Sequence, residues 1–268
     1  MSHQKYSNRS SKKINLITQA IISALALTPL WLNAAEEDAS NVDVKVDEIM
    51  TVTAQKRVQN IMKVPVTVDS ISNEDIKQSG SIELNDIDKF IPGFEFGEGT
   101  QAGVTMRGVS SPNISAGGDP STAIFFDGVY LPRAAQNVMF SDMERVEVLK
   151  GPQGTLFGKN AAMGVVNMIP NAPQDEFEAF VKGSFGTDEL QRFEGMANFA
   201  ITDSLYVRVN ALSNTQGGYA TNVADSVLNT GEKVWDAGEK DHQSARIAVK
   251  WDISSRTDAQ LSYDWDQW

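Results

Sequence analysis

A regular alternation of apolar and polar residues runs through the chain from Phe177 onward. It fills five segments, 177–185, 193–201, 205–211, 245–251 and 259–265, with apolar or small residues on one parity and mostly polar residues on the other. Successive side chains of a strand point to opposite faces, so each segment predicts a strand with one apolar and one polar face. Such strands suit a membrane barrel, with lipid outside and water inside, or a soluble antiparallel sheet with one wet face. Trp251, Tyr263 and Trp265 at strand ends favour the barrel, because aromatic residues gather at membrane interfaces.

The connections between these segments predict an orientation. Those at 202–204 and 253–256 are short and fall at the same edge of the sheet, because two strands separate them. The connection 214–242, at the opposite edge, is long and polar. Membrane barrels have short periplasmic turns and longer extracellular loops, so we expect the short-turn edge on the periplasmic side.

The segment 55–173 has a different pattern, which predicts one small α+β domain. Ser72 offers an N-cap for a short helix that Gly80 ends, and a second short helix is expected at about 82–90. Strand-like stretches are expected at 64–68, 94–96, 104–108 and 123–130.

The run from Arg145 to Asn160 combines a strand with a glycine-rich turn. It alternates through Val146 and Val148, turns at Gly151, Pro152, Gly154 and Gly158, and leads into an apolar strand at 165–169. A phosphate-binding loop requires a glycine five positions before its Gly-Lys pair and a Ser or Thr after it. Gln153 and Asn160 occupy those two positions, so the glycines are expected to form tight turns between strands.

Residues 1–35 have the pattern of a signal peptide. Four cations precede an apolar stretch centred on 20–27, and Ala34 and Ala35 provide a cleavage site. The stretch falls short of the ~20 apolar residues that span a bilayer as a helix, although an uncleaved anchor helix is the alternative. Any membrane span in the remaining chain is expected to be β-structure, because no other segment is apolar for long enough.

Composition argues against several function classes. The chain carries 23 Lys and Arg against 35 Asp and Glu, a net charge of −12, which argues against nucleic acid as a partner. It has no cysteine, and His242 is the only histidine outside the leader. Disulfides and Cys metal sites are therefore excluded, and a single histidine argues against His-based catalysis or metal ligation. We expect no catalytic residues, no metal site, no cofactor and no enzymatic activity.

Six motifs carry a resemblance to a known family. They are Val64-Pro-Val-Thr-Val68, Ile91-Pro-Gly93, Met106-Arg-Gly108, Phe126-Asp-Gly-Val-Tyr-Leu-Pro-Arg133, Glu144-Arg-Val-Glu-Val-Leu-Lys-Gly-Pro152 and Gly164-Val-Val-Asn167. Through their order and spacing, the chain resembles the N-terminal part of TonB-dependent outer-membrane receptors. The resemblance implies an α+β plug domain at 55–173 and, at 174–268, the first antiparallel strands of a transmembrane β-barrel. Two positions depart from the usual plug pattern: Met163-Gly164 replaces the common Gly-Gly, and Pro170 stands where Thr is frequent.

The resemblance also implies binding residues. Residues 36–54 are expected to be a flexible leader that ends in a TonB box, which adds as a strand to TonB, the protein energised by an inner-membrane complex. The predicted box consists of Asp47, Glu48, Ile49, Met50, Thr51, Val52, Thr53 and Ala54. An ordinary first strand of the next domain is the alternative for this peptide. The candidate ligand-binding residues are Ser110, Ser111, Pro112, Asn113, Leu131, Pro132 and Arg133, with plain turns as the alternative.

The implied function is gated transport. We expect a receptor in the outer membrane of a Gram-negative bacterium, with its box in the periplasm, that takes up a scarce ligand. Ferric siderophores are the commonest cargo of the family, but cobalamin, haem, oligosaccharides and small aromatic or plant-derived compounds are also carried on this scaffold. A soluble periplasmic binding or adaptor protein, made of the plug and a small sheet, is the alternative.

The number of strands bears on that choice. Receptors of this family close about 22 strands around the plug, and an open sheet would leave unpaired edges in the bilayer. We therefore expect these residues to be the N-terminal part of a longer receptor.

Overall fold

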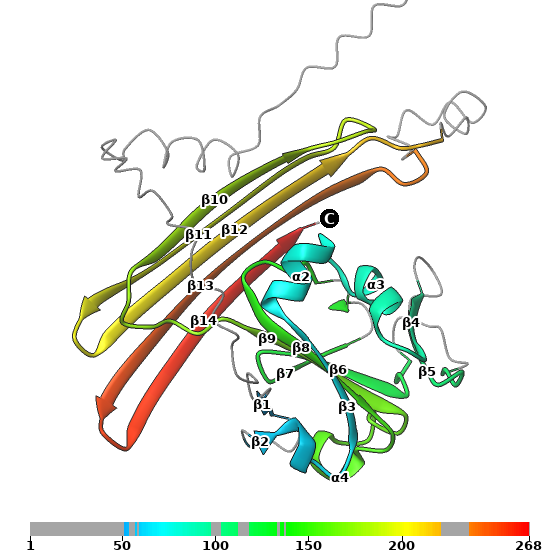
Figure 1. The fold of residues 1–268 in the computed structure, drawn as a ribbon, viewed down its shortest axis with the longest axis horizontal. Coiled ribbons are helices and arrows are strands. Elements are labelled where there is room, and N and C mark those ends of the chain that lie inside the picture. The colour runs from blue at the N-terminus through cyan, green and yellow to red at the C-terminus, as the bar shows by residue number, and fades with distance from the viewer. Residues whose placement is uncertain are drawn as a thin grey trace, which may run out of the picture.

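The structure, a computed structural model, describes residues 51–53, 57, 59–97, 103–111, 118–132, 135–136, 138–220 and 236–267. The predicted signal peptide and residues 36–50 lie outside the described residues. The predicted plug domain lies against the concave face of a sheet of long strands (Figure 1). Within the described ranges, no helix has the length and apolar character needed to cross a membrane.

A mixed five-stranded sheet forms the centre of the plug domain, in the order β3-β8-β9-β6-β7. Its strands are β3 (Thr67–Ser72), β6 (Thr122–Phe126), β7 (Val129–Leu131), β8 (Met143–Lys150) and β9 (Gly164–Pro170). Strands β6 and β9 are parallel, and the other neighbours are antiparallel. Two small sheets flank it: β1 (Thr51–Val52) with β2 (Gln59–Asn60), and β4 (Phe94–Gly97) with β5 (Gly103–Met106).

The first predicted helix is confirmed as α2 (Asn73–Ser79). The Ser72 hydroxyl accepts a hydrogen bond from the Asp75 N–H, and the Asp75 carboxylate accepts one from the Ser72 N–H. This capping box satisfies two N–H groups that a helix start leaves unpaired. Gly80 ends the helix with φ +70°, a left-handed conformation that glycine adopts without strain. The second predicted helix is shorter and divided into α3 (Leu84–Ile87) and the 3₁₀ turn η2 (Asp88–Phe90); a further turn, η1, spans Ile61–Lys63.

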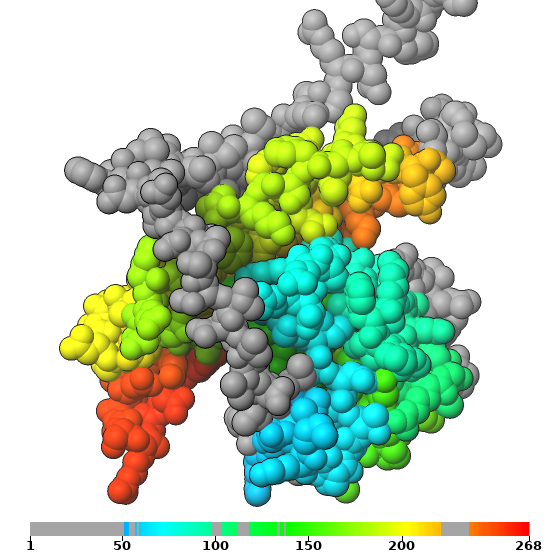
Figure 2. Space-filling model, in the orientation of Figure 1, coloured from blue at the N-terminus to red at the C-terminus, as the bar shows by residue number. Residues whose placement is uncertain are grey.

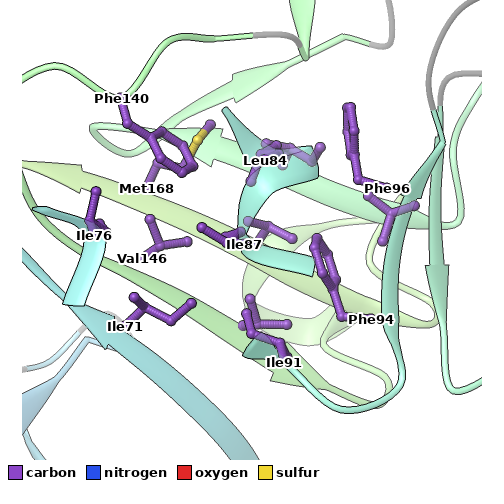
Figure 3. Close-up of a cluster of buried hydrophobic side chains, with 14 of the residues drawn as sticks. Ile71, Ile76, Leu84, Ile87, Ile91, Phe94, Phe96, Phe140, Val146 and Met168 are labelled. Atoms are coloured by element: carbon purple, nitrogen blue, oxygen red, sulfur yellow. The ribbon is translucent and has the colours of Figure 1, made fainter. Parts of the chain in front are cut away.

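Both faces of the central sheet are buried. On one face, α2 and α3 pack against β8 and β9, and Figure 3 shows side chains such as Ile76, Leu84 and Ile87 gathered with Val146 and Met168. On the other face, a second cluster is formed by Val52, Ala123, Phe125, Leu149, Ala161 and Val165. A strand buried on both sides needs apolar residues at successive positions, which explains why β9 is apolar apart from Asn167.

The glycine-rich run differs from the prediction in one respect. Gly154–Phe157 form a short helix, α4, where only turns were expected. The ring of Phe157 packs edge-on against Phe125, with ring centroids 5.3 Å apart. This aromatic contact anchors the turn of helix to the second cluster, a tertiary effect that local glycine content does not reveal.

Of the two positions that depart from the usual plug pattern, the Met163-Gly164 pair has a clear structural reading. A Cβ atom at Gly164 would lie 2.5 Å from the carbonyl oxygen of Leu149, so only glycine permits this approach of β9 to β8. Met163 is partly buried against the main core cluster. The chain thus keeps glycine at position 164, where there is no space for a side chain, and has a methionine at position 163 that packs against the core.

The five predicted barrel strands are confirmed as one antiparallel sheet in chain order, which we call the wall sheet. They are β10 (Glu178–Phe185), β11 (Gln191–Thr202), β12 (Leu205–Gln216), β13 (Lys240–Ser254) and β14 (Thr257–Gln267). Strands β12 and β13 are longer than their apolar alternation, with pairing that continues to Gln216 opposite Lys240. Strands pair through backbone hydrogen bonds, which do not require apolar side chains, so a strand can continue through polar residues. The alternation therefore predicts only the part of each strand that has one apolar and one polar face.

The two faces of the wall sheet differ as the alternation predicts. Phe199, Val207, Val249 and Leu261 stand opposite one another in the ladder and form an apolar row on the convex face. The opposite parity, which includes Asn198, Arg208 and Ala248, faces the plug domain and is buried there. The hairpin between β13 and β14, in orange and red, projects beyond the plug domain (Figure 2).

Candidate functional site

The described part of the predicted TonB box is docked on the plug domain. Thr51 and Val52 form β1 and pair with Asn60 and Gln59 of β2. The Val52 side chain is fully buried in the second apolar cluster. Residues 47–50 and Ala54 of the box lie outside the described residues.

Thr53 continues this docking through a buried carboxylate, Glu147 of β8. The Thr53 N–H donates to Glu147 Oε1 at 2.7 Å, and the Thr53 hydroxyl lies 3.1 Å from the same oxygen. Arg145 Nε donates to Glu147 Oε1 at 2.8 Å, and Asn167 Nδ2 donates to the Thr53 hydroxyl at 3.4 Å. Glu147 is completely buried, so these partners provide the hydrogen bonds that a desolvated carboxylate requires.

Neither Glu147 nor Asn167 was identified as a functional residue from the sequence, although both lie in the family motifs. A signal was present for Asn167, which is the one polar side chain in the otherwise apolar strand β9, whereas Glu147 lies among several charged residues of β8. Their common partner, however, is Thr53, which is 94 residues from Glu147 and 114 from Asn167 along the chain.

The predicted ligand-binding residues follow two strands of the plug domain. Ser110 and Ser111 come after the β5 turn, in which Arg107 adopts φ +51° and Met106 bridges to Val109. Ser110 is exposed, and the Ser111 hydroxyl donates to the Asp119 carbonyl oxygen at 3.5 Å.

In the second loop, Leu131 ends β7 and packs against the main core cluster, whereas Pro132 is exposed. Pro112, Asn113 and Arg133 lie outside the described residues. The core contact of Leu131 favours a packing role for that side chain.

Polar contacts join the plug domain to the wall sheet, and we call them the seam. Arg208 of β12 binds both carboxylate oxygens of Asp142, with Nη2 2.6 Å from Oδ1, and Asn210 accepts a hydrogen bond from the Ser141 hydroxyl at 3.3 Å. Both side chains of the Arg208–Asp142 pair are almost completely buried. A bidentate guanidinium–carboxylate pair is among the strongest side-chain hydrogen-bond arrangements.

The seam continues along β11 and β13. Lys240 Nζ lies 3.0 Å from Glu83 Oε1, Arg246 forms an ion pair with Asp127, and Arg192 donates to the Gly80 carbonyl oxygen at 3.4 Å. In each ion pair of the seam, the wall sheet supplies the cation and the plug domain the carboxylate. The sequence alternation predicted the polar face of these strands but not which plug residues meet it.

Glu83 is ionised in this setting. Burial of the side chain opposes ionisation, but hydrogen bonds from His242 and Lys240 outweigh it and lower the pKa of Glu83 below its usual value. The carboxylate therefore remains charged and paired with Lys240 at neutral pH.

The connection from plug to sheet is held by side-chain amides. Asn198 of β11 is fully buried; its Nδ2 donates to the carbonyl oxygens of Gln174 and Glu176, and its Oδ1 accepts from the Gln174 N–H. Asn171 Nδ2 donates to Asp142 Oδ1 at 2.8 Å. The linker after β9 is thus fixed to β11 and to the carboxylate that Arg208 binds.

Within the described ranges, no group of three or more His, Asp and Glu side chains is arranged to hold a metal ion.

Comparison with known proteins identifies the family. Residues 60–165 match the model of the TonB-dependent Receptor Plug Domain. The vitamin B12 transporter BtuB of Vibrio vulnificus is 31% identical over 192 residues, which cover 68% of this chain and 29% of that protein. The catecholate siderophore receptor Fiu of Escherichia coli is 28% identical over 241 residues, which cover 84% of this chain and 28% of the relative.

A solved structure supports the same fold. The ferripyoverdine receptor of the Pseudomonas aeruginosa outer membrane, bound to ferripyoverdine, superposes with a TM-score of 0.66 at 16% identity, over 81% of this chain and 27% of that one. The chain spans about three tenths of the length of the curated relatives it matches. Receptors of this family are transporters of the Gram-negative outer membrane and are not enzymes. The plug fold, the wall sheet and these matches together show that the chain belongs to the TonB-dependent receptor family and comprises its plug domain followed by the first strands of the barrel.

Proposed function

We propose that this chain belongs to an outer-membrane receptor that takes up a scarce ligand by TonB-energised transport. The observation that carries the proposal is the seating of the plug domain on the polar face of the wall sheet, with buried ion pairs between them. A plug held inside a barrel in this way closes the barrel until it is rearranged. The exposed apolar side chains of the convex face, which include Phe199, Ile247 and Leu261, fit contact with lipid.

The box peptide couples the receptor to TonB, which provides the energy for transport. Residues 47–54 pair with TonB by strand addition, in which main-chain hydrogen bonds give affinity. Thr51 and Val52 already adopt strand geometry in β1, which supports this use of the segment. Force on the box then acts on the plug domain, and the reaction cycle needs no covalent chemistry.

For the ligand, we propose a ferric siderophore, bound by the loops around 110–113 and 131–133. Relatives named as a catecholate siderophore receptor and a ferripyoverdine receptor support this choice. The Vibrio relative is named as a vitamin B12 transporter, so cobalamin is the competing ligand.

The test is uptake by cells in which the full-length gene is deleted and then restored. We expect restored cells to accumulate radiolabelled iron from a ferric catecholate, and the accumulation to stop when TonB is removed. Labelled cyanocobalamin serves as the matched control ligand. Accumulation of cobalamin, with no difference in iron uptake between deleted and restored cells, would contradict the ferric assignment.

A further inference from the structure

One buried carboxylate of the plug domain meets two basic side chains of the wall sheet. Glu83 directly precedes α3, and its side chain is 5% exposed. Its Oε1 atom lies 3.0 Å from Lys240 Nζ and 3.5 Å from His242 Nδ1, and both bases lie near the start of β13. A lysine keeps its positive charge around neutral pH, whereas a histidine changes its charge between about pH 5 and 8. The number of ion pairs that Glu83 forms therefore depends on the protonation of one imidazole.

A second carboxylate, Asp266 of β14, belongs to the same cluster. It accepts a hydrogen bond from the Met139 backbone N–H and interacts electrostatically with both His242 and Glu83. When the imidazole is neutral, the two carboxylates share the single cation of Lys240. Protonation of His242 balances these charges, and an ion pair is stronger in a partly buried place than in water.

The position of His242 on β13 leaves it open to the medium but without another charge facing it across the ladder. Asn214, its partner on β12, is uncharged, and Asp241 belongs to the opposite face of β13. The imidazole is 13% exposed and ends the connection 214–242, which we expect on the extracellular side. Protons from the outer medium can therefore reach it.

We propose that His242 is a proton switch in the seam: when the external pH falls, the protonated imidazole forms a second ion pair with Glu83, and the plug domain is held more tightly to β13. Burial opposes ionisation of Glu83, but hydrogen bonds from His242 and Lys240 lower its pKa below the usual value, so the carboxylate stays charged in weak acid. A base that gains a partner in the folded state adds stability that is complete at low pH and is lost as the pH rises through its titration. This contact should be strongest below about pH 6 and weaken towards about pH 8.

Hydrogen exchange tests the switch without ligand or TonB. The full-length receptor and its His242→Gln variant, whose side-chain amide does not ionise, are compared at about pH 5.5 and 7.5 by mass spectrometry of the segment 81–91. At the lower pH the parent should exchange more slowly, by up to roughly fivefold, and at the higher pH the two proteins should match. Comparison at the same pH removes the effect of pH on the exchange chemistry. Equal exchange at the lower pH, or a difference of the same size at both, would overturn the proposal.

Two further variants separate the switch from simple damage to the seam. His242→Lys carries a charge at both pH values, so the segment should stay protected at both. Asp241→Asn changes a titratable residue on the opposite face of β13 and should behave as the parent does. A His242→Lys variant that exchanges as fast as His242→Gln at both pH values would show that charge at this position does not hold Glu83.

The consequence for transport rests on the proposed TonB-energised function. With a ferric catecholate as the probe, a change of the medium from about pH 7.5 to 5.5 should slow uptake by the parent relative to His242→Gln, because a tighter seam opposes rearrangement of the plug domain. Faster uptake by the parent than by the variant in acid would contradict this consequence. A parent receptor that takes up no ferric catecholate at either pH contradicts the ligand proposal, and hydrogen exchange then decides the switch alone.

Discussion

At the scale of single residues, two buried carboxylates of the plug domain hold other parts of the chain: one binds the predicted box and the other binds the wall sheet. Glu147 receives Thr53 at the end of the predicted box, and Asp142 receives Arg208 of the wall sheet. Removing one member of a buried ion pair costs about 3–5 kcal/mol, because the other charge is left without compensation.

Substitution of Glu147 should loosen the box. Glu147→Gln keeps the shape but removes the charge that Arg145 neutralises, which weakens the site for Thr53. We expect faster protease cleavage within residues 47–60 of the receptor in outer-membrane vesicles, without ligand. Asp119→Asn, which alters an exposed ion pair, is the control and should not change the cleavage rate. Unchanged cleavage of the Glu147 variant would show that this carboxylate does not hold the box.

At the scale of elements, β1 is a strand with two roles that compete. Its residues pair with β2 and bury Val52 in the plug domain, and the same backbone belongs to the peptide predicted to pair with TonB. To pair with TonB, β1 can either use the edge that does not face β2 or separate from β2 altogether. Residues 47–50 precede β1, so a substitution among them leaves the paired residues Thr51 and Val52 themselves unchanged.

A proline in that part should separate TonB pairing from plug stability. Ile49→Pro removes a backbone donor and fixes φ, so strand addition to TonB should fail and uptake should stop, while ligand binding to intact cells persists. Val44→Pro, upstream of the box, is the matched control and should transport normally. Normal uptake by the Ile49 variant would refute the assignment of the box.

At the scale of the whole molecule, the wall sheet separates two environments. Its concave face meets the plug domain through charged side chains, and its convex face exposes large apolar residues such as Ile247, Trp251 and Tyr263. A soluble sheet would place those apolar side chains in water. The distribution therefore favours lipid on the convex side and supports the barrel proposal over a soluble periplasmic protein.

Neighbouring substitutions on β14 provide the test. Leu261→Lys puts a charge on the convex face and should cost up to ~2–4 kcal/mol near the midplane, so less folded receptor should reach the outer membrane. Gln260→Lys puts the same charge one residue away on the opposite face, where it should be tolerated. The measurement is the amount of heat-modifiable receptor in outer-membrane fractions. Equal amounts of the two variants would contradict lipid contact.

The sequence by itself determined the family and most of the elements, although it did not predict the helix α4. Alternation after Phe177 predicted all five wall strands and their two faces, Ser72 and Gly80 marked both ends of α2, and the ordered motifs indicated the plug. These features are local, because strand periodicity, capping and turn chemistry involve residues a few positions apart.

Only the tertiary structure decided how the parts are joined. Thr53 meets Glu147 across 94 positions, and Arg208 meets Asp142 across 66. The sequence shows these residues as polar side chains, and it places Arg208 on the polar face of its strand, but periodicity does not indicate the partner of any of them. The same holds for Gly164, whose need for glycine comes from the Leu149 carbonyl of the next strand. Docking of the box and the seam follow from where separate strands lie in space, which the fold sets and the local pattern does not.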